Sequence, residues 1–149
     1  MKKYISIFYI ALRLFLGGFM IYGGINKFKK PIPKPIEVVS KAQKFTSPEK
    51  ENTLQKILYI SGAKQTGYFW QVLGICELLF GFLLIIQGTG FIGALFLLPI
   101  TLHIFLFHLF LEPDELVELL QTGVFLTVNI LLVLKEKEKW KHLLWIQPI

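Results

Sequence analysis

The sequence predicts an all-α integral membrane protein, in which a bundle of four transmembrane helices carries an extramembrane cap between its first and second helices. Hydrophobic residues make up 54% of the 149 positions, and the mean hydropathy is +0.58. That composition is too apolar for one soluble core of this size. The apolar residues gather in four long runs, and residues 31–67 form the one long polar insertion. We therefore predict one four-span membrane domain over residues 1–149.

The first apolar run extends from Tyr4 to Ile25 and is interrupted only by Arg13. About 20 residues suffice to cross the hydrocarbon of a bilayer. The run follows two lysines, as in a secretory signal, but no small-residue cleavage site comes after it. We expect it to be retained as the first helix.

The second and third runs form a predicted antiparallel hairpin. They cover residues 68–86, interrupted by Glu77, and residues 91–111. Only the turn Gln87-Gly88-Thr89-Gly90 separates them. Such a short neutral connection forces the two helices to be neighbours.

The fourth run covers residues 119–134, and we expect its helix to begin near Pro113. Proline suits a first helical turn, and the acidic residues between 114 and 118 suit the positive end of a helix dipole. Lysines and two tryptophans follow the run, which is typical of the headgroup region.

The insertion at 31–67 is predicted to cap the bundle. Its alternating prolines at 31, 33 and 35 cannot continue the first helix. Ser47-Pro48-Glu49 is a typical helix start, and apolar residues from 54 to 58 repeat at helical spacing. At least one amphipathic helix should result.

The net charge of +6 indicates anionic lipid headgroups rather than nucleic acid as the partner, because the lysines flank the apolar runs. With four spans both termini share one side, and we place them in the cytoplasm. A single cysteine, Cys76, excludes a disulfide within one chain.

Polar residues inside the apolar runs are the candidate functional residues. Arg13 and Glu77 are predicted to lie at one depth and to pair, because a lone charge in hydrocarbon costs about 3 kcal/mol or more. His103 and Asn129 are each expected within a few helical turns of this pair. We predict an intramembrane polar pocket of Arg13, Glu77, His103 and Asn129.

Glycines share a face with each of these two charges. The stripes at helical spacing are Arg13, Gly17, Met20 and Gly24 in the first span, and Gly74, Glu77, Gly81 and Gly88 in the second. Small residues let helices approach closely. The first two spans should therefore be in contact along this seam.

The role of the charged pair has two interpretations, a structural lock between helices and a functional site. His108 and Lys27 are predicted at the membrane interface. We identify no metal-binding motif at either histidine and predict no metal site. No catalytic residue is assigned.

Three stretches resemble the DoxX family of small four-helix bacterial membrane proteins. They are Leu12-Arg13-Leu14-Phe15-Leu16-Gly17 with Gly23-Gly24-Ile25-Asn26-Lys27-Phe28, then Gly74-Ile75-Cys76-Glu77-Leu78-Leu79-Phe80-Gly81, and the segment from Pro99 to Pro113. The resemblance implies a location in the bacterial inner (cytoplasmic) membrane. For some relatives it also implies a part in the quinone-linked oxidation of sulfur compounds or thiols.

Three functions remain open from the sequence. The first is a small subunit of a quinone-linked membrane redox complex, with a quinone as cofactor and no covalently bound group. The second is a non-catalytic accessory or assembly protein that recruits another membrane protein or a second copy of the chain. The third is a small transporter, which ranks lowest because no second row of polar residues crosses all four helices.

Overall fold

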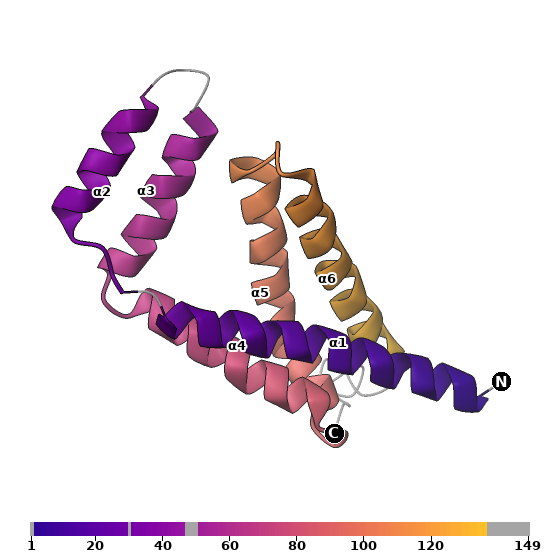
Figure 1. The fold of residues 1–149 in the computed structure, drawn as a ribbon. Helices are drawn as coiled ribbons and strands as arrows, with labels where there is room; N and C mark the ends of the chain where they lie inside the picture. Colours follow the sequence, from indigo (N-terminus) through magenta and orange to yellow (C-terminus); the bar gives the residue numbers. More distant parts are fainter. Residues whose placement is uncertain (1, 30, 47–50, 137–149) are drawn as a thin grey trace, which may run out of the picture.

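The computed structural model describes residues 2–29, 31–46 and 51–136, and their regular structure is entirely helical (Figure 1). The elements are α1 (Lys2–Lys29), α2 (Pro35–Ala42), a short 3-10 helix η1 (Gln43–Phe45), α3 (Glu51–Gln65), α4 (Phe69–Ile85), α5 (Gly90–Leu111) and α6 (Leu116–Lys135). The all-α prediction is confirmed for the described residues.

Three helices, α1, α5 and α6, are each long and apolar enough to cross a membrane. The 17-residue helix α4 meets that condition only together with α3, and the two are bent by 87° at their junction. The structure thus supports three spans, or four when α3 and α4 count as one broken span. Only 17% of the apolar stretch of α1 is buried inside the protein, so lipid must cover most of its surface.

Helices α1 and α4 pack antiparallel along their glycines, as the two stripes predict. A Cβ atom placed on Gly24 would lie 2.8 Å from the Gly74 carbonyl oxygen, and one on Gly81 would lie 3.1 Å from that of Gly17. Gly88 falls outside the stripe, because α4 ends at Ile85 and Gly88 lies in the following turn. Backbone contact this close sets the register of the two helices.

The α4–α5 turn is equally tight. The Thr89 hydroxyl donates a hydrogen bond to the Leu83 carbonyl at 2.9 Å, and any side chain at Gly93 would overlap the backbone of Leu84.

The α5–α6 hairpin rises from one side of the α1–α4 pair, as does the α2–α3 hairpin (Figure 1). A small buried core joins α1, α4, α5 and α6. It consists of Leu16, Met20, Leu84, Ala94, Leu97, Phe125, Val128 and Leu132.

The start of α6 differs from the prediction. It begins at Leu116, whereas Pro113 lies in a turn closed by the Glu115 amide, which donates to the Glu112 carbonyl at 3.1 Å. Glu112, directly before the proline, has φ −140° and ψ 49°, which is not helical. The ring of a proline disfavours the helical conformation in the residue before it, and here that restriction produced a turn.

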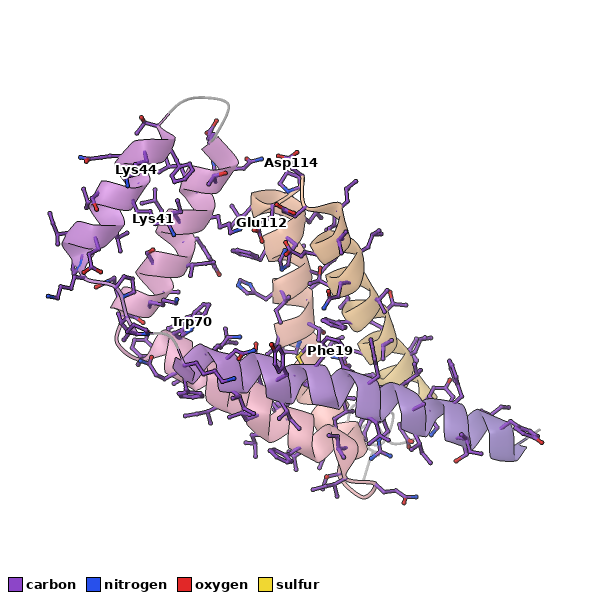
Figure 2. All side chains as sticks on the ribbon, viewed as in Figure 1. Phe19, Lys41, Lys44, Trp70, Glu112 and Asp114 are labelled. Carbon is purple, nitrogen blue, oxygen red and sulfur yellow. The ribbon has the colours of Figure 1, made fainter. Side chains whose placement is uncertain are left out.

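The insertion contains two α-helices, α2 and α3, so its predicted helix is confirmed. The predicted start at Ser47-Pro48-Glu49 lies outside the described residues. Side-chain contacts hold α3 beside α5. Lys56 forms an ion pair with Glu112, which directly follows α5, the Tyr59 hydroxyl hydrogen-bonds His103 Nε2 at 2.5 Å, and the Tyr59 ring lies 5.7 Å from that of Phe107. The insertion therefore packs beside the end of the α5–α6 hairpin at which α5 turns into α6, near Glu112 (Figure 2).

The α1–α4 packing predicts different costs for two exchanges in α1. Gly24→Leu should lower the free energy of unfolding by about 1–3 kcal/mol, because the new side chain must displace the α4 backbone. Gly18→Leu should be nearly neutral, since a Cβ at Gly18 meets nothing within 4 Å. Denaturant unfolding in one detergent measures both variants. Equal losses would show that α1 and α4 do not pack through Gly24.

Candidate functional site

Glu77 is the most deeply buried charged residue that the structure describes, with 1% of its surface exposed. Its carboxylate accepts two hydrogen bonds from Lys27 Nζ of α1, at 2.8 Å to Oε1 and 2.6 Å to Oε2. Lys27 also lies over the Trp70 ring, 5.3 Å from its centroid. The predicted interfacial lysine is thus the partner of the buried carboxylate.

The predicted pairing of Arg13 with Glu77 is wrong. Arg13 instead donates hydrogen bonds to three carbonyls at the end of α4: Leu84 at 2.8 Å, Ile85 at 3.0 Å and Ile86 at 2.6 Å. These carbonyls have no partner within the helix, and a cation is favourable at a helix C-terminus. Arg13 therefore fixes the end of α4 to α1.

The error came from the assumed depth of the two helices. The prediction placed the start of α1 level with the end of α4, but Arg13 is already level with the end of α4, and α1 begins at Lys2. Glu77 precedes Ile85 by eight residues, which is about 12 Å along the helix. Aligning Gly17 with Gly81 and Gly24 with Gly74 would have brought Glu77 within reach of Lys27.

The other two residues of the predicted pocket lie apart from Glu77. Asn129 is fully buried, and its side-chain amide donates to the Thr101 hydroxyl at 3.0 Å, which joins α6 to α5. His103 is exposed and contacts Tyr59 of α3. The structure therefore does not bring Arg13, Glu77, His103 and Asn129 together.

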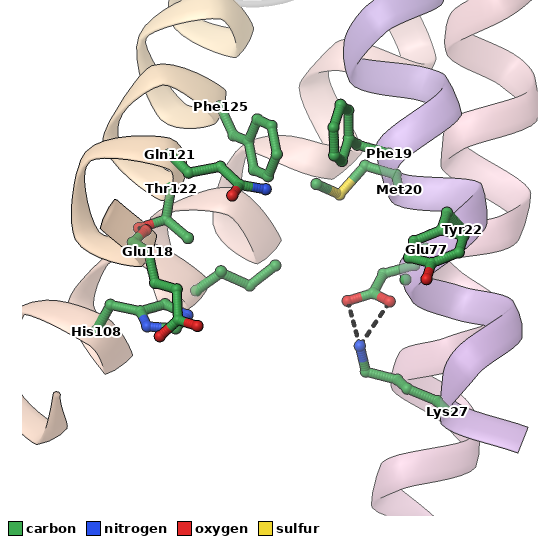
Figure 3. A pocket seen from close by; sticks show the side chains of 12 residues that line it. Phe19, Met20, Tyr22, Lys27, Glu77, His108, Glu118, Gln121, Thr122 and Phe125 are labelled. Atoms are coloured by element: carbon green, nitrogen blue, oxygen red, sulfur yellow. Dashed lines mark hydrogen bonds and ion pairs between the residues drawn. The ribbon is translucent and has the colours of Figure 1, made fainter. Parts of the chain in front are cut away.

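A cavity of about 270 Å³ lies between the α1–α4 pair and the α5–α6 hairpin (Figure 3). Its polar lining is Lys27, Glu77, His108, Glu118, Gln121 and Thr122, and its other lining residues are Phe19, Met20, Tyr22, Gly23, Ile104 and Phe125. Lys27 and Glu77 lie on one wall, opposite His108, Glu118 and Gln121 on the other (Figure 3). Sequence reasoning missed the wall from α6, because Glu118 precedes the expected apolar run at 119–134 and Gln121, near the start of that run, was not among the candidate residues.

This chemistry suits an amphipathic ligand with an aromatic ring. The aromatic rings of Phe19 and Phe125 lie 4.9 Å apart and form part of the apolar lining. The polar groups on opposite walls include a cation, carboxylates, an imidazole and an amide. Sites of this kind, apolar with a few placed polar groups, are typical of small-molecule binding.

The geometry predicts which pairs of residues are energetically coupled. In a double-mutant cycle, Lys27→Leu with Glu77→Leu should show a coupling of about 1–3 kcal/mol, because each single exchange strands the other charge. Arg13→Leu with Glu77→Leu serves as the matched cycle and should add to within about 0.5 kcal/mol. Unfolding free energies in one detergent decide the matter. Coupling in the second cycle but not the first would restore the pairing expected from the sequence.

Comparison with known proteins identifies one family for this chain. No curated protein and no solved structure matches the chain. The profile of one protein family, DoxX, matches residues 8–109, which is more than half of the chain. The matched residues include most of α1, all of α4 and most of α5, together with Lys27, Glu77 and His108, whereas α6 lies beyond them. This multi-pass membrane protein therefore belongs to the DoxX family.

Proposed function

We propose that this protein binds the headgroup of a quinone in the cavity between its helix pairs and serves as the quinone-docking subunit of a redox complex in the bacterial cytoplasmic membrane. The observation that carries the proposal is the pair of polar walls facing one another across an apolar cavity (Figure 3). A quinone ring has the same character, with two carbonyl oxygens at opposite ends of an apolar ring.

The size of the cavity fits a single substituted ring. Its volume is about 270 Å³, whereas an apolar cavity of about 150 Å³ already accepts benzene. A shallow apolar hollow lined by Leu14, Phe15, Gly18, Phe19 and Tyr22 shares its last two residues with the cavity. The isoprenoid tail of a quinone would leave the cavity along this surface of α1 toward the lipid.

Each wall offers a donor or a proton carrier. The Lys27 ammonium group donates two hydrogen bonds to the Glu77 carboxylate. An ammonium group has three N–H donors, so the third N–H is available to a quinone oxygen. On the opposite wall, the Gln121 amide and the His108 imidazole are available. Glu77 and His108 are also groups that can exchange protons with a bound ligand.

A bound quinone takes up two electrons and two protons and becomes a quinol. In this proposal a partner protein that oxidises thiols supplies both, so that two thiols and one quinone give one disulfide and one quinol. The residues of this chain hold the ring, place donors at its oxygens and carry protons. The oxidation of the thiols and the reduction of the quinone take place in the complex of this chain with that partner.

The cap favours the second candidate function, an accessory protein that recruits a membrane partner. Ile36 and Val39 of α2 are 72% and 51% exposed, and the lysines at 41 and 44 lie on the same α2–η1 segment (Figure 2). Exposed apolar and basic side chains together are typical of a surface that docks on a protein or a lipid headgroup. The two functions differ in whether the cavity binds a ligand.

Quenching of Trp70 fluorescence tests the proposal, since Trp70 lies beside Lys27. With Trp140→Phe and Trp145→Phe as background, a short-chain ubiquinone titrated into nanodiscs should quench Trp70 saturably. Lys27→Met should weaken binding about tenfold or more, because it removes a charge-assisted donor.

Gly23→Leu and Gly62→Leu form a matched pair for this experiment. The first fills the cavity, because a Cβ at Gly23 meets only Glu77 Oε2 at 3.4 Å, and the second adds the same side chain in open space on α3. Saturable quenching should be lost in Gly23→Leu and retained in Gly62→Leu. Equal quenching in both would mean that quinone does not enter the cavity, and the accessory function would then be preferred.

A further inference from the structure

Three possible metal ligands converge where α5 turns into α6, at the edge of the cavity. His108 lies in the last turn of α5, Glu112 directly follows that helix, and Glu118 lies in the first turn of α6. One ligand atom from each residue lies within 4.8 Å of the other two. The sharp turn at Pro113 brings Glu118 back beside His108, which the sequence analysis did not anticipate.

The histidine is placed as a metal ligand would be. His108 Nδ1 is buried and lies 2.9 Å from Glu112 Oε2, yet it makes no hydrogen bond. The i and i+4 spacing puts His108 and Glu112 on one face of the helix end. Glu112 is the residue four positions after His108, and the sequence analysis did not consider it when it predicted no metal site.

The charges around the cluster favour a cation. The carboxylates of Glu112 and Glu118 contribute two negative charges, and among the described residues Lys56 is the one ammonium group in ion-pair contact with this cluster. Lys56 binds Glu112 Oε1, so Oε2 stays directed toward His108. The Glu118 carboxylate has no ion pair within the part of the chain that the structure describes, and its side chain lines the cavity.

We propose that His108, Glu112 and Glu118 bind a divalent transition metal ion such as Zn²⁺ or Mn²⁺. One imidazole and two carboxylates form a donor set that suits both ions. Ligand bonds of about 2.0–2.2 Å require the three side chains to close around the ion by small rotamer changes. His108 and Glu118 both line the cavity, so the proposed ion would lie at its edge. This site does not depend on the binding of a quinone.

Titration of Zn²⁺ and of Mn²⁺ into the full-length protein tests the site. The protein is purified without a histidine tag, reconstituted in nanodiscs and studied by calorimetry. One ion should bind per chain, and His108→Gln and Glu118→Gln should each weaken its affinity at least tenfold. Glu115→Gln removes a nearby carboxylate of the same turn that is outside the cluster, and it should leave the affinity unchanged.

X-ray absorption at the zinc edge supplies an independent measurement. The bound ion should show one imidazole nitrogen in its first shell, and that signal should disappear in His108→Gln. Glu118→Gln alters an exposed side chain, so it keeps the test valid if His108→Gln fails to fold. No stoichiometric binding, or equal affinity in Glu118→Gln and Glu115→Gln, would overturn the proposal, and neither result depends on how quinone binds.

Discussion

The close antiparallel packing of α1 against α4 is the constraint on which the rest of this structure depends. In lipid the hydrophobic effect cannot hold two helices together, so contact between backbones has to do so. Gly17, Gly24, Gly74 and Gly81 allow that contact. Once these glycines face one another the register is fixed, and with it the partners of both charges: Lys27 for Glu77, and the end of α4 for Arg13.

The two charges then have different roles. Arg13 satisfies carbonyls that a helix end leaves free, and its guanidinium lies against Gly90 at the start of α5. Glu77 and Lys27 instead line a cavity shared with α5 and α6. A buried ion pair seldom adds much stability, and under the proposed function this pair serves the ligand in the cavity.

The opposite wall of the cavity is built by a turn rather than by a helix face. Pro113 ends α5 and delays the start of α6, and this places Glu118 beside His108 and Glu112. Lys56 brings the insertion to the same place through Glu112. The cavity, the candidate metal ligands and the insertion therefore meet at one end of the α5–α6 hairpin.

The sequence by itself determined the all-α class, the apolar runs, the α4–α5 hairpin, the glycine seam and the family, because each depends on local composition or on helical spacing. It also singled out Glu77 as a charge that needs a partner. It did not determine which partner, since a depth counted from the ends of apolar runs ignores how far α1 extends beyond the end of α4. The wall of Glu118 and Gln121, and the approach of Lys56 to Glu112, join segments far apart in the chain. Those contacts depend on how the helices pack and on the path of the turn at Pro113. The spacing of residues within one segment carries no information about the distance of that segment from another.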